Sequence, residues 1–142
     1  MKITGNGIHE KMNRYVADTM ALVLRLESRK LPNLAKETFI QAEGNQVELF
    51  APAMVLSEVA YLSEKGRIDI GLEEVEKYIH NNSHITEHPL TLQTVKVAFS
   101  INDIPELHDR LITASAKETN SVLITNDPAM KKSSHIETLW KQ

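Results

Sequence analysis

Cysteine is absent from the 142 residues of this chain. That absence excludes disulfide bonds, thiolate zinc sites and a cysteine nucleophile, and it is typical of proteins kept in a reducing compartment. Any metal ion must therefore be held by oxygen or imidazole ligands. Aromatic residues are also scarce, at 5% of the sequence, so the hydrophobic core must be largely aliphatic.

The sequence also lacks long apolar segments. No stretch approaches the run of about 20 apolar residues that a membrane-spanning helix needs. The first dozen residues are polar, contain Gly5 and Gly7, and do not form a secretory signal. We therefore expect a cytoplasmic protein with no membrane partner. The remaining composition, 42% hydrophobic and 25% charged, is that of an ordinary globular protein.

An excess of positive charge is missing as well. The net charge of -3 argues against an extended nucleic-acid-binding face, because such faces depend on concentrated Lys and Arg. A nucleic-acid enzyme would need local basic residues around an acidic site. The basic residues that could contact phosphates are Arg25, Arg29, Lys30, Arg110, Lys131 and Lys132. Arg110 is the first to test, since it directly follows a candidate acidic residue.

The order of the predicted elements indicates the fold class. Residues 1–13 have no sustained periodicity and are interpreted as an N-terminal tail, followed by a single domain over residues 14–142. Predicted strands cover residues 14–17, 47–51, 84–90, 121–125 and 135–139, and predicted helices cover 19–27, 34–42, 53–65, 72–82, 91–101, 106–120 and 128–132. This alternation predicts a three-layer, doubly wound α/β domain, Rossmann-like, with a mostly parallel sheet of about five strands.

Two aspartates follow predicted strands directly. Asp18 ends the stretch "RYVAD", and Asp127 ends "SVLITND". In open parallel sheets, ligands bind beyond the carboxyl ends of the strands, so both side chains should reach the same edge. The alternative for each is helix capping, because Asp is a favoured N-cap and Pro128 suits a first helical position.

Two further acids lie on predicted helices that should face the sheet. Glu58 has Val55 and Val59 as neighbours, so it lies on or beside an apolar stripe and needs a partner. The alternative is a boundary residue that turns to water or pairs with a cation. Asp109 precedes the small residues 113–116, which would let its helix lie close to the sheet. Its alternative is a first-turn acid that complements the helix dipole.

Together, these four acids describe a cation site. At a separation of about 6 Å and an effective dielectric constant near 20, each ionised pair would repel by about 3 kcal/mol. Either the pKa values rise or a divalent ion binds. Oxygen ligands favour Mg²⁺ or Mn²⁺ over zinc.

The stretches "YVADTMALVLRL", "PAMVLSEVAYL" and "LHDRLITASAKETNSVLITND" resemble, in order and spacing, the PIN-domain ribonucleases, and in size most of all the VapC-type toxins of type II toxin–antitoxin systems. The resemblance implies a PIN-like domain that hydrolyses RNA phosphodiester bonds as an endoribonuclease dependent on Mg²⁺ or Mn²⁺. It places the catalytic and metal-binding acids on Asp18, Glu58, Asp109 and Asp127, with Thr19, Thr125 and Asn126 as supporting residues. Separately from the resemblance, Arg110 is a candidate RNA contact because it is adjacent to Asp109.

The resemblance also implies three partners: an RNA substrate, a cognate antitoxin and a second copy of the chain in a homodimer. Two alternative functions stay open. One is a PIN-like module that binds RNA or protein without catalysis, which predicts RNA retention without turnover. The other is a PIN nuclease that serves RNA maturation, which predicts no growth arrest on expression.

Overall fold

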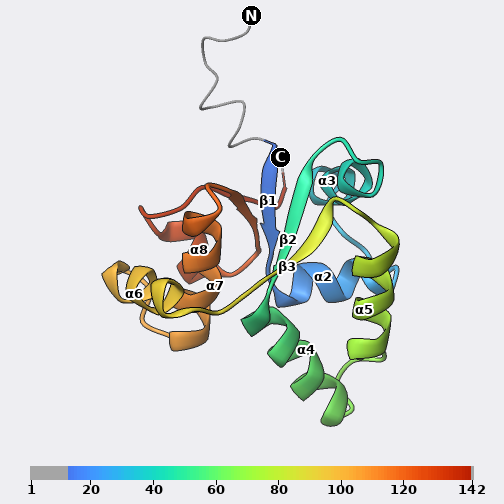
Figure 1. The fold of residues 1–142 in the computed structure, drawn as a ribbon, viewed down its shortest axis with the longest axis horizontal. Helices are drawn as coiled ribbons and strands as arrows, with labels where there is room; N and C mark the ends of the chain where they lie inside the picture. The colour runs from blue at the N-terminus through green and yellow to red at the C-terminus, as the bar shows by residue number, and fades with distance from the viewer. Residues whose placement is uncertain (1–12, 142) are drawn as a thin grey trace, which may run out of the picture.

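The computed structural model describes residues 13–141, so the predicted tail lies outside the described residues except for Asn13. Consecutive strands are separated by one or two helices along the chain (Figure 1). The elements are β1 (Arg14–Ala17), α2 (Thr19–Leu26), α3 (Asn33–Glu43), β2 (Glu48–Pro52), α4 (Ala53–Glu64), α5 (Leu72–Asn81), β3 (Ile85–His88), α6 (Leu92–Ser100), α7 (Leu107–Glu118), β4 (Val122–Ile124), α8 (Pro128–Lys132) and β5 (Thr138–Leu139). No helix between residues 13 and 141 is long and apolar enough to span a membrane.

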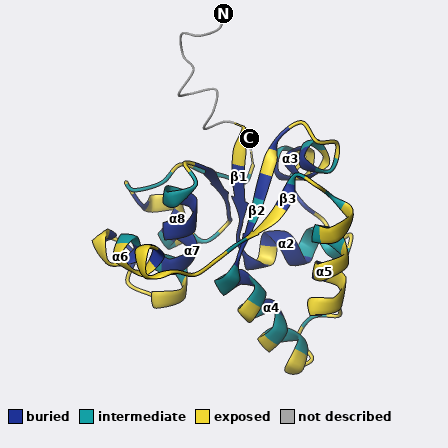
Figure 2. Cartoon of the chain, in the orientation of Figure 1, coloured by how far each residue is buried: buried dark blue, intermediate teal, exposed yellow. Residues whose placement is uncertain are grey.

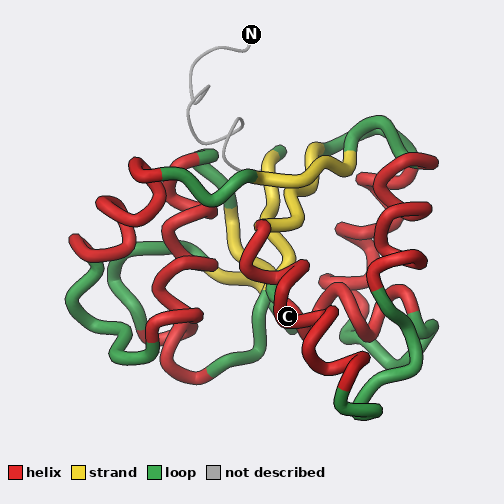
Figure 3. Tube along the Cα trace, turned by 60° about the horizontal axis from the view of Figure 1, so that its bottom comes forward, coloured by secondary structure: helices red, strands yellow, loops and turns green. Residues whose placement is uncertain are grey.

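The five strands form one sheet in the order β3-β2-β1-β4-β5, and all neighbouring strands run parallel. Strand β1 lies in the centre, where Val16 is opposite Phe50 of β2 and Leu123 of β4. Figure 1 places α6, α7 and α8 on one side of the sheet and α2, α3 and α5 on the other, and Figure 3 shows helices flanking the strands from a second direction. The predicted doubly wound α/β fold is confirmed.

Local sequence features explain where several elements begin and end. Asp18 caps α2 by accepting a hydrogen bond from the N–H of Ala21 at 2.9 Å. Pro128 occupies the first position of α8, where its missing N–H has no cost. After α7, Asn120 adopts a φ of 54°, in the left-handed region that Asn tolerates, and the chain turns into β4.

The core is largely aliphatic, as the low aromatic content predicted, although Phe39 and Tyr15 belong to it. Strands β1 and β4 are buried between the helices except at Arg14, whereas Thr86 and Glu87 of the edge strand β3 and the outer faces of α5 and α6 are exposed (Figure 2). The largest fully buried side chains include Phe39, Leu22, Leu49, Ile85, Ile112 and Leu123. The small residues of 113–116 are all buried, which lets α7 lie directly against β1 and β4.

The last strand is shorter than predicted. It covers only Thr138–Leu139, whereas the sequence pattern indicated residues 135–139. The backbone N–H groups of Leu123 and Thr125 donate to the carbonyls of Glu137 and Leu139. The N–H of His135 instead donates to the hydroxyl of Ser133 at 3.1 Å, so the chain before Glu137 forms a turn.

Candidate functional site

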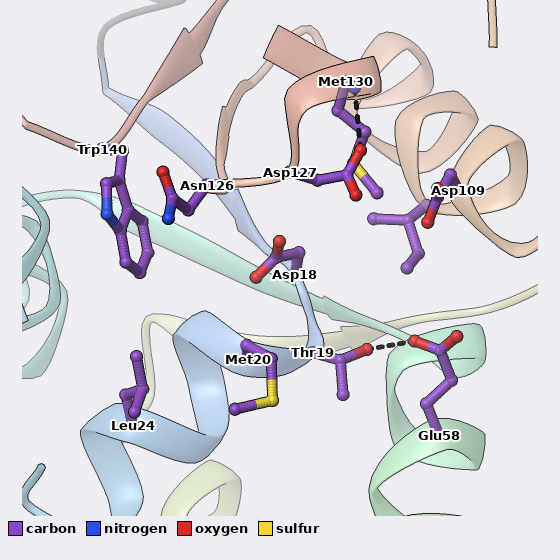
Figure 4. A pocket seen from close by; sticks show the side chains of 11 residues that line it. Asp18, Thr19, Met20, Leu24, Glu58, Asp109, Asn126, Asp127, Met130 and Trp140 are labelled. Atoms are coloured by element: carbon purple, nitrogen blue, oxygen red, sulfur yellow. Dashed lines mark hydrogen bonds between the residues drawn. The ribbon is translucent and has the colours of Figure 1, made fainter.

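The four predicted acids line one pocket of about 370 Å³ (Figure 4). Each comes from a different part of the fold: Asp18 follows β1, Glu58 lies on α4, Asp109 lies in the first turn of α7, and Asp127 follows β4. The complete lining is Asp18, Thr19, Met20, Leu24, Glu58, Asp109, Ile112, Asn126, Asp127, Met130 and Trp140. The parallel sheet therefore gathers carboxylates that are remote in the sequence, at the carboxyl edge of its strands.

Asp18 is the most buried of the four acids, with 9% of its surface exposed. Its Oδ1 accepts the capping hydrogen bond from Ala21, and its Oδ2 accepts one from the hydroxyl of Thr125. Burial raises the pKa of Asp18 to about 6, and the negative charges of Asp127 and Glu58 add to the rise, although the two hydrogen bonds oppose it. Asp18 thus caps a helix and lines the pocket at once.

Asp127 is half-buried and caps α8 through a hydrogen bond of 3.0 Å from the N–H of Met130 to its Oδ2. Its own N–H donates to the hydroxyl oxygen of Thr125 at 3.0 Å. Thr125 is fully buried, so one fixed hydroxyl contacts both Asp18 and the backbone of Asp127.

Asp109 carries a strongly shifted carboxyl group. Burial raises the pKa of Asp109 to about 7, and negative charges add to it, first from Asp127 and Glu106 and then from Glu58 and Asp18. The N–H of Asp109 donates to the carboxylate of Glu106 at 2.8 Å, so Glu106 is the residue that caps α7. Asp109 is therefore both a first-turn acid and a pocket residue.

Glu58 is half-buried, and its carboxylate has polar partners, as expected for an acid beside an apolar stripe. One of its carboxylate oxygens accepts a hydrogen bond from the hydroxyl of Thr19. The other oxygen lies 3.4 Å from Nδ1 of His108, which is also 3.5 Å from Glu106. Sequence reasoning missed His108, because no spacing rule brings a half-exposed histidine of α7 to a glutamate of α4.

Two other predicted residues lie at or near the pocket. Asn126 is exposed and lines it, and its Oδ1 accepts a hydrogen bond from Nζ of Lys131 at 3.1 Å. Arg110 is absent from the lining. Its Nε donates to the carbonyl of Ile104 at 2.5 Å, and its guanidinium lies 5.4 Å from the ring centre of Phe99. A contact between Arg110 and RNA stays a prediction.

The pocket also has an apolar wall that sequence reasoning missed. Trp140, Leu24 and Met20 lie on one side of Asp18, and Glu58 and the other acids lie on the opposite side (Figure 4). A signal for Trp140 was present in the sequence. It directly follows the last strand, so it reaches the same sheet edge as Asp18.

The donor set of the pocket fits a hard divalent cation. Its acidic side offers carboxylate, hydroxyl and amide oxygens, the ligands that Mg²⁺ and Mn²⁺ prefer. Between residues 13 and 141, no three His, Asp or Glu side chains converge closely enough to hold an ion by themselves. Mg²⁺ usually keeps several waters and is held by one or two carboxylates, so binding of a hydrated ion does not require three converging side chains. Burial is the main cause of the raised pKa values of Asp18 and Asp109, and the neighbouring carboxylates, whose negative charge such an ion would offset, add to the rise.

Comparison with known proteins gives one family match. A family model described as "PIN domain" matches residues 15–135. No match was found among curated proteins.

Solved structures share the fold. VapBC2 from Rickettsia felis, bound to a DNA fragment from its promoter, has a TM-score of 0.68 at 15% identity, over 91% of this chain and 98% of that chain. DNA-bound VapBC from Salmonella typhimurium has a TM-score of 0.65 at 15% identity, over 90% and 98%. A toxin–antitoxin complex from Klebsiella pneumoniae has a TM-score of 0.61 at 14% identity, over 90% and 99%.

Proposed function

The chain belongs to the PIN-domain family, and from this membership we propose that it is a divalent-metal-dependent endoribonuclease that acts as the toxin of a toxin–antitoxin pair. PIN-domain proteins are nucleases, and they generally use divalent metal ions. The observation that carries the proposal is the meeting of four carboxylates, from four separate elements, in one pocket. Their catalytic and metal-binding roles are part of the proposal.

In the proposed mechanism, Asp18 and Asp127 would hold Mg²⁺ or Mn²⁺. An ionised carboxylate has about four lone-pair positions, and the oxygens of Asp18 use only one each for Ala21 and Thr125. The hydrogen bonds from Ala21 and Thr125 fix the orientation of the Asp18 side chain, and its remaining lone pairs can still bind an ion in the pocket. Bound there, the ion supplies positive charge that offsets the charge developing on the phosphate and makes water more acidic.

Glu58 and Asp109 would complete the site or orient the attacking water. Glu58 is held from two sides by Thr19 and His108, so its carboxylate has a defined direction. Asp109 lies in the first turn of α7 and lines the same pocket, so its carboxylate would accept a hydrogen bond from the attacking water.

The proposed partners are RNA, a cognate antitoxin and a second copy of the chain. The antitoxin is supported by the similar structures, which include VapBC complexes and a toxin–antitoxin complex. Growth arrest on expression, relieved by the product of a neighbouring gene, would support the toxin role. Expression without arrest would favour RNA maturation.

The direct test is cleavage of structured RNA by the purified protein with and without Mn²⁺. Asp18→Asn and Asp127→Asn should each lose cleavage, because each removes a negative charge while leaving a side chain that can still cap its helix. Asp69→Asn is the matched control, since Asp69 is exposed and does not line the pocket. Equal cleavage by Asp18→Asn and the parent would overturn the proposal.

A further inference from the structure

The pocket has two chemically different sides, and the proposed hydrolysis uses only one of them. The acids would bind the metal ion and orient the attacking water beside the phosphate. Trp140, Leu24 and Met20 offer no group for that chemistry, yet they line the same cavity (Figure 4). Met20 is 42% exposed although it is a large apolar residue, so this wall is open to solvent.

Trp140 is the aromatic residue of this wall. It is half-buried, it packs against the hydrophobic core, and it directly follows β5. A tryptophan held in this way presents a large flat surface with little loss of side-chain freedom on binding. It is the sole tryptophan of the chain.

Two polar residues extend the wall toward solvent. The Asn126 side chain lies on the same side of the pocket as Trp140 (Figure 4). Its carbonyl oxygen accepts from Lys131, so its amide NH₂ remains to donate. Lys131 also belongs to the surface around Trp140, because both residues line the neighbouring cavity at β5. A flat aromatic ring, an amide donor and a positive charge are therefore grouped beside the acids.

Resting on the proposed ribonuclease function, we propose that Trp140 stacks on a nucleobase of single-stranded RNA beside the phosphate to be cleaved. Asn126 contacts the edge of that base, and Lys131 contacts a neighbouring phosphate. Unstacked bases of single strands are commonly bound on aromatic side chains, because every base has a π face. Stacking also supplies binding energy that does not depend on positive charge, which suits a chain with a net charge of -3.

Fluorescence of Trp140 provides a readout that is independent of cleavage. Metal-free parent protein is titrated with single-stranded oligoribonucleotides of one base type, in four separate series, and with an abasic oligomer of equal length and charge. We expect quenching by at least one base-containing oligomer and none by the abasic oligomer. Equal quenching by the abasic oligomer, or no quenching in any of the four series, would overturn the base site.

Three variants separate stacking from general apolar packing. Trp140→Leu should weaken binding of the quenching oligomer by about 5- to 150-fold, the range measured for loss of one stacked base. Trp140→Phe keeps a ring and should retain most of the affinity. Tyr61→Leu removes an aromatic side chain of α4 that is 56% exposed and outside the pocket, and it should bind like the parent. Binding is measured by anisotropy of the labelled oligomer, and thermal melting verifies that each variant is folded.

The outcomes distinguish this base site from the proposed function. If the parent cleaves RNA with Mn²⁺ but Trp140→Leu binds and cleaves equally well, the base site is wrong and the nuclease stands. If base-dependent quenching occurs but no RNA is cleaved, the nuclease is wrong and the base site stands.

Discussion

The buried hydroxyl of Thr125 donates a hydrogen bond to the carboxylate of Asp18. The same hydroxyl accepts from the backbone N–H of Asp127 at 3.0 Å, so one side chain at the end of β4 orients two of the proposed metal ligands. Partners that orient metal ligands typically contribute about 10- to 100-fold in metal affinity.

Thr125→Val should therefore weaken Mn²⁺ binding by about 10- to 100-fold. The substitution preserves the shape of the side chain but removes the hydrogen bond that lowers the pKa of Asp18. Thr125→Ser keeps the hydroxyl and is the matched control. The dissociation constant is measured by calorimetric titration near neutral pH, and a Thr125→Val protein that binds Mn²⁺ as tightly as the Ser variant would contradict the prediction.

The stability of the metal-free protein should fall as pH rises through the pKa values of the pocket acids. Burial raises the pKa of Asp18 to about 6 and that of Asp109 to about 7, whereas an unfolded Asp titrates near pH 4. Between these values the folded state binds more protons than the unfolded state. The stabilisation by these protons is complete below about pH 4 and is lost as pH rises through about 7.

Asp109→Asn removes one of these titrations. We expect the variant to melt several degrees above the parent at about pH 7.5 and to differ little at about pH 4, in chelator-treated protein. Asp69→Asn, which is outside the pocket, should leave the melting temperature unchanged at both pH values. A lower melting temperature for Asp109→Asn at the higher pH would rule out this account.

Millimolar Mn²⁺ should raise the melting temperature of the parent protein. A ligand that binds only the folded state at 100 times its dissociation constant stabilises by about 2.7 kcal/mol. The shift should be smaller at about pH 5.5 than at about pH 7.5, because protons compete for Asp18 and Asp109. Asp18→Asn should lose most of the shift, and an undiminished shift in that variant would place the ion elsewhere.

A second polar cluster stabilises the fold away from the pocket acids. Glu43 of α3 accepts hydrogen bonds from Arg25 of α2 at 3.0 and 2.7 Å and from the hydroxyl of Tyr78 of α5. Glu43→Gln should lower the free energy of unfolding by about 1–2 kcal/mol, because the half-buried guanidinium loses its counter-charge.

Glu48→Gln is the comparison for this cluster. Glu48 pairs with Arg14 at 3.5 Å, but both side chains are about half exposed, so its loss should cost about 0.5 kcal/mol or less. Urea unfolding of both variants measures the difference. If both substitutions lowered the free energy of unfolding equally, burial would not strengthen the interactions of Glu43.

The spacing of hydrophobic residues predicted the helices and strands, and the position of acids at the ends of strands predicted part of the site. Each predicted helix and strand has a counterpart, because capping residues such as Asp18 and turn residues such as Asn120 mark the boundaries locally. Because the carboxyl ends of parallel strands meet at one edge of the sheet, the sequence predicted that Asp18 and Asp127 would lie in the same site. The resemblance to PIN domains is confirmed by the family match.

The remaining features depend on tertiary contacts. His108 meets Glu58 only because α7 and α4 pack against each other, which no single-helix pattern encodes. The residues before β5 are typical of a strand, but the N–H of His135 donates a hydrogen bond to the hydroxyl of Ser133 instead of to a neighbouring strand. The strand therefore covers only Thr138–Leu139. The apolar wall of the pocket was not predicted, because Trp140 follows a strand as Asp18 and Asp127 do but carries no acidic group that would mark it as a site residue.

The central place of β1 determines when the pocket can form during translation. Tyr15 of β1 is opposite Val122 of β4, so β1 can pair with β4 only after most of the polypeptide has been synthesised. A nascent chain that ends before residue 127 lacks both Asp127 and Trp140. Incomplete chains cannot assemble the full pocket, so the proposed nuclease activity would begin only once synthesis of the chain is nearly finished.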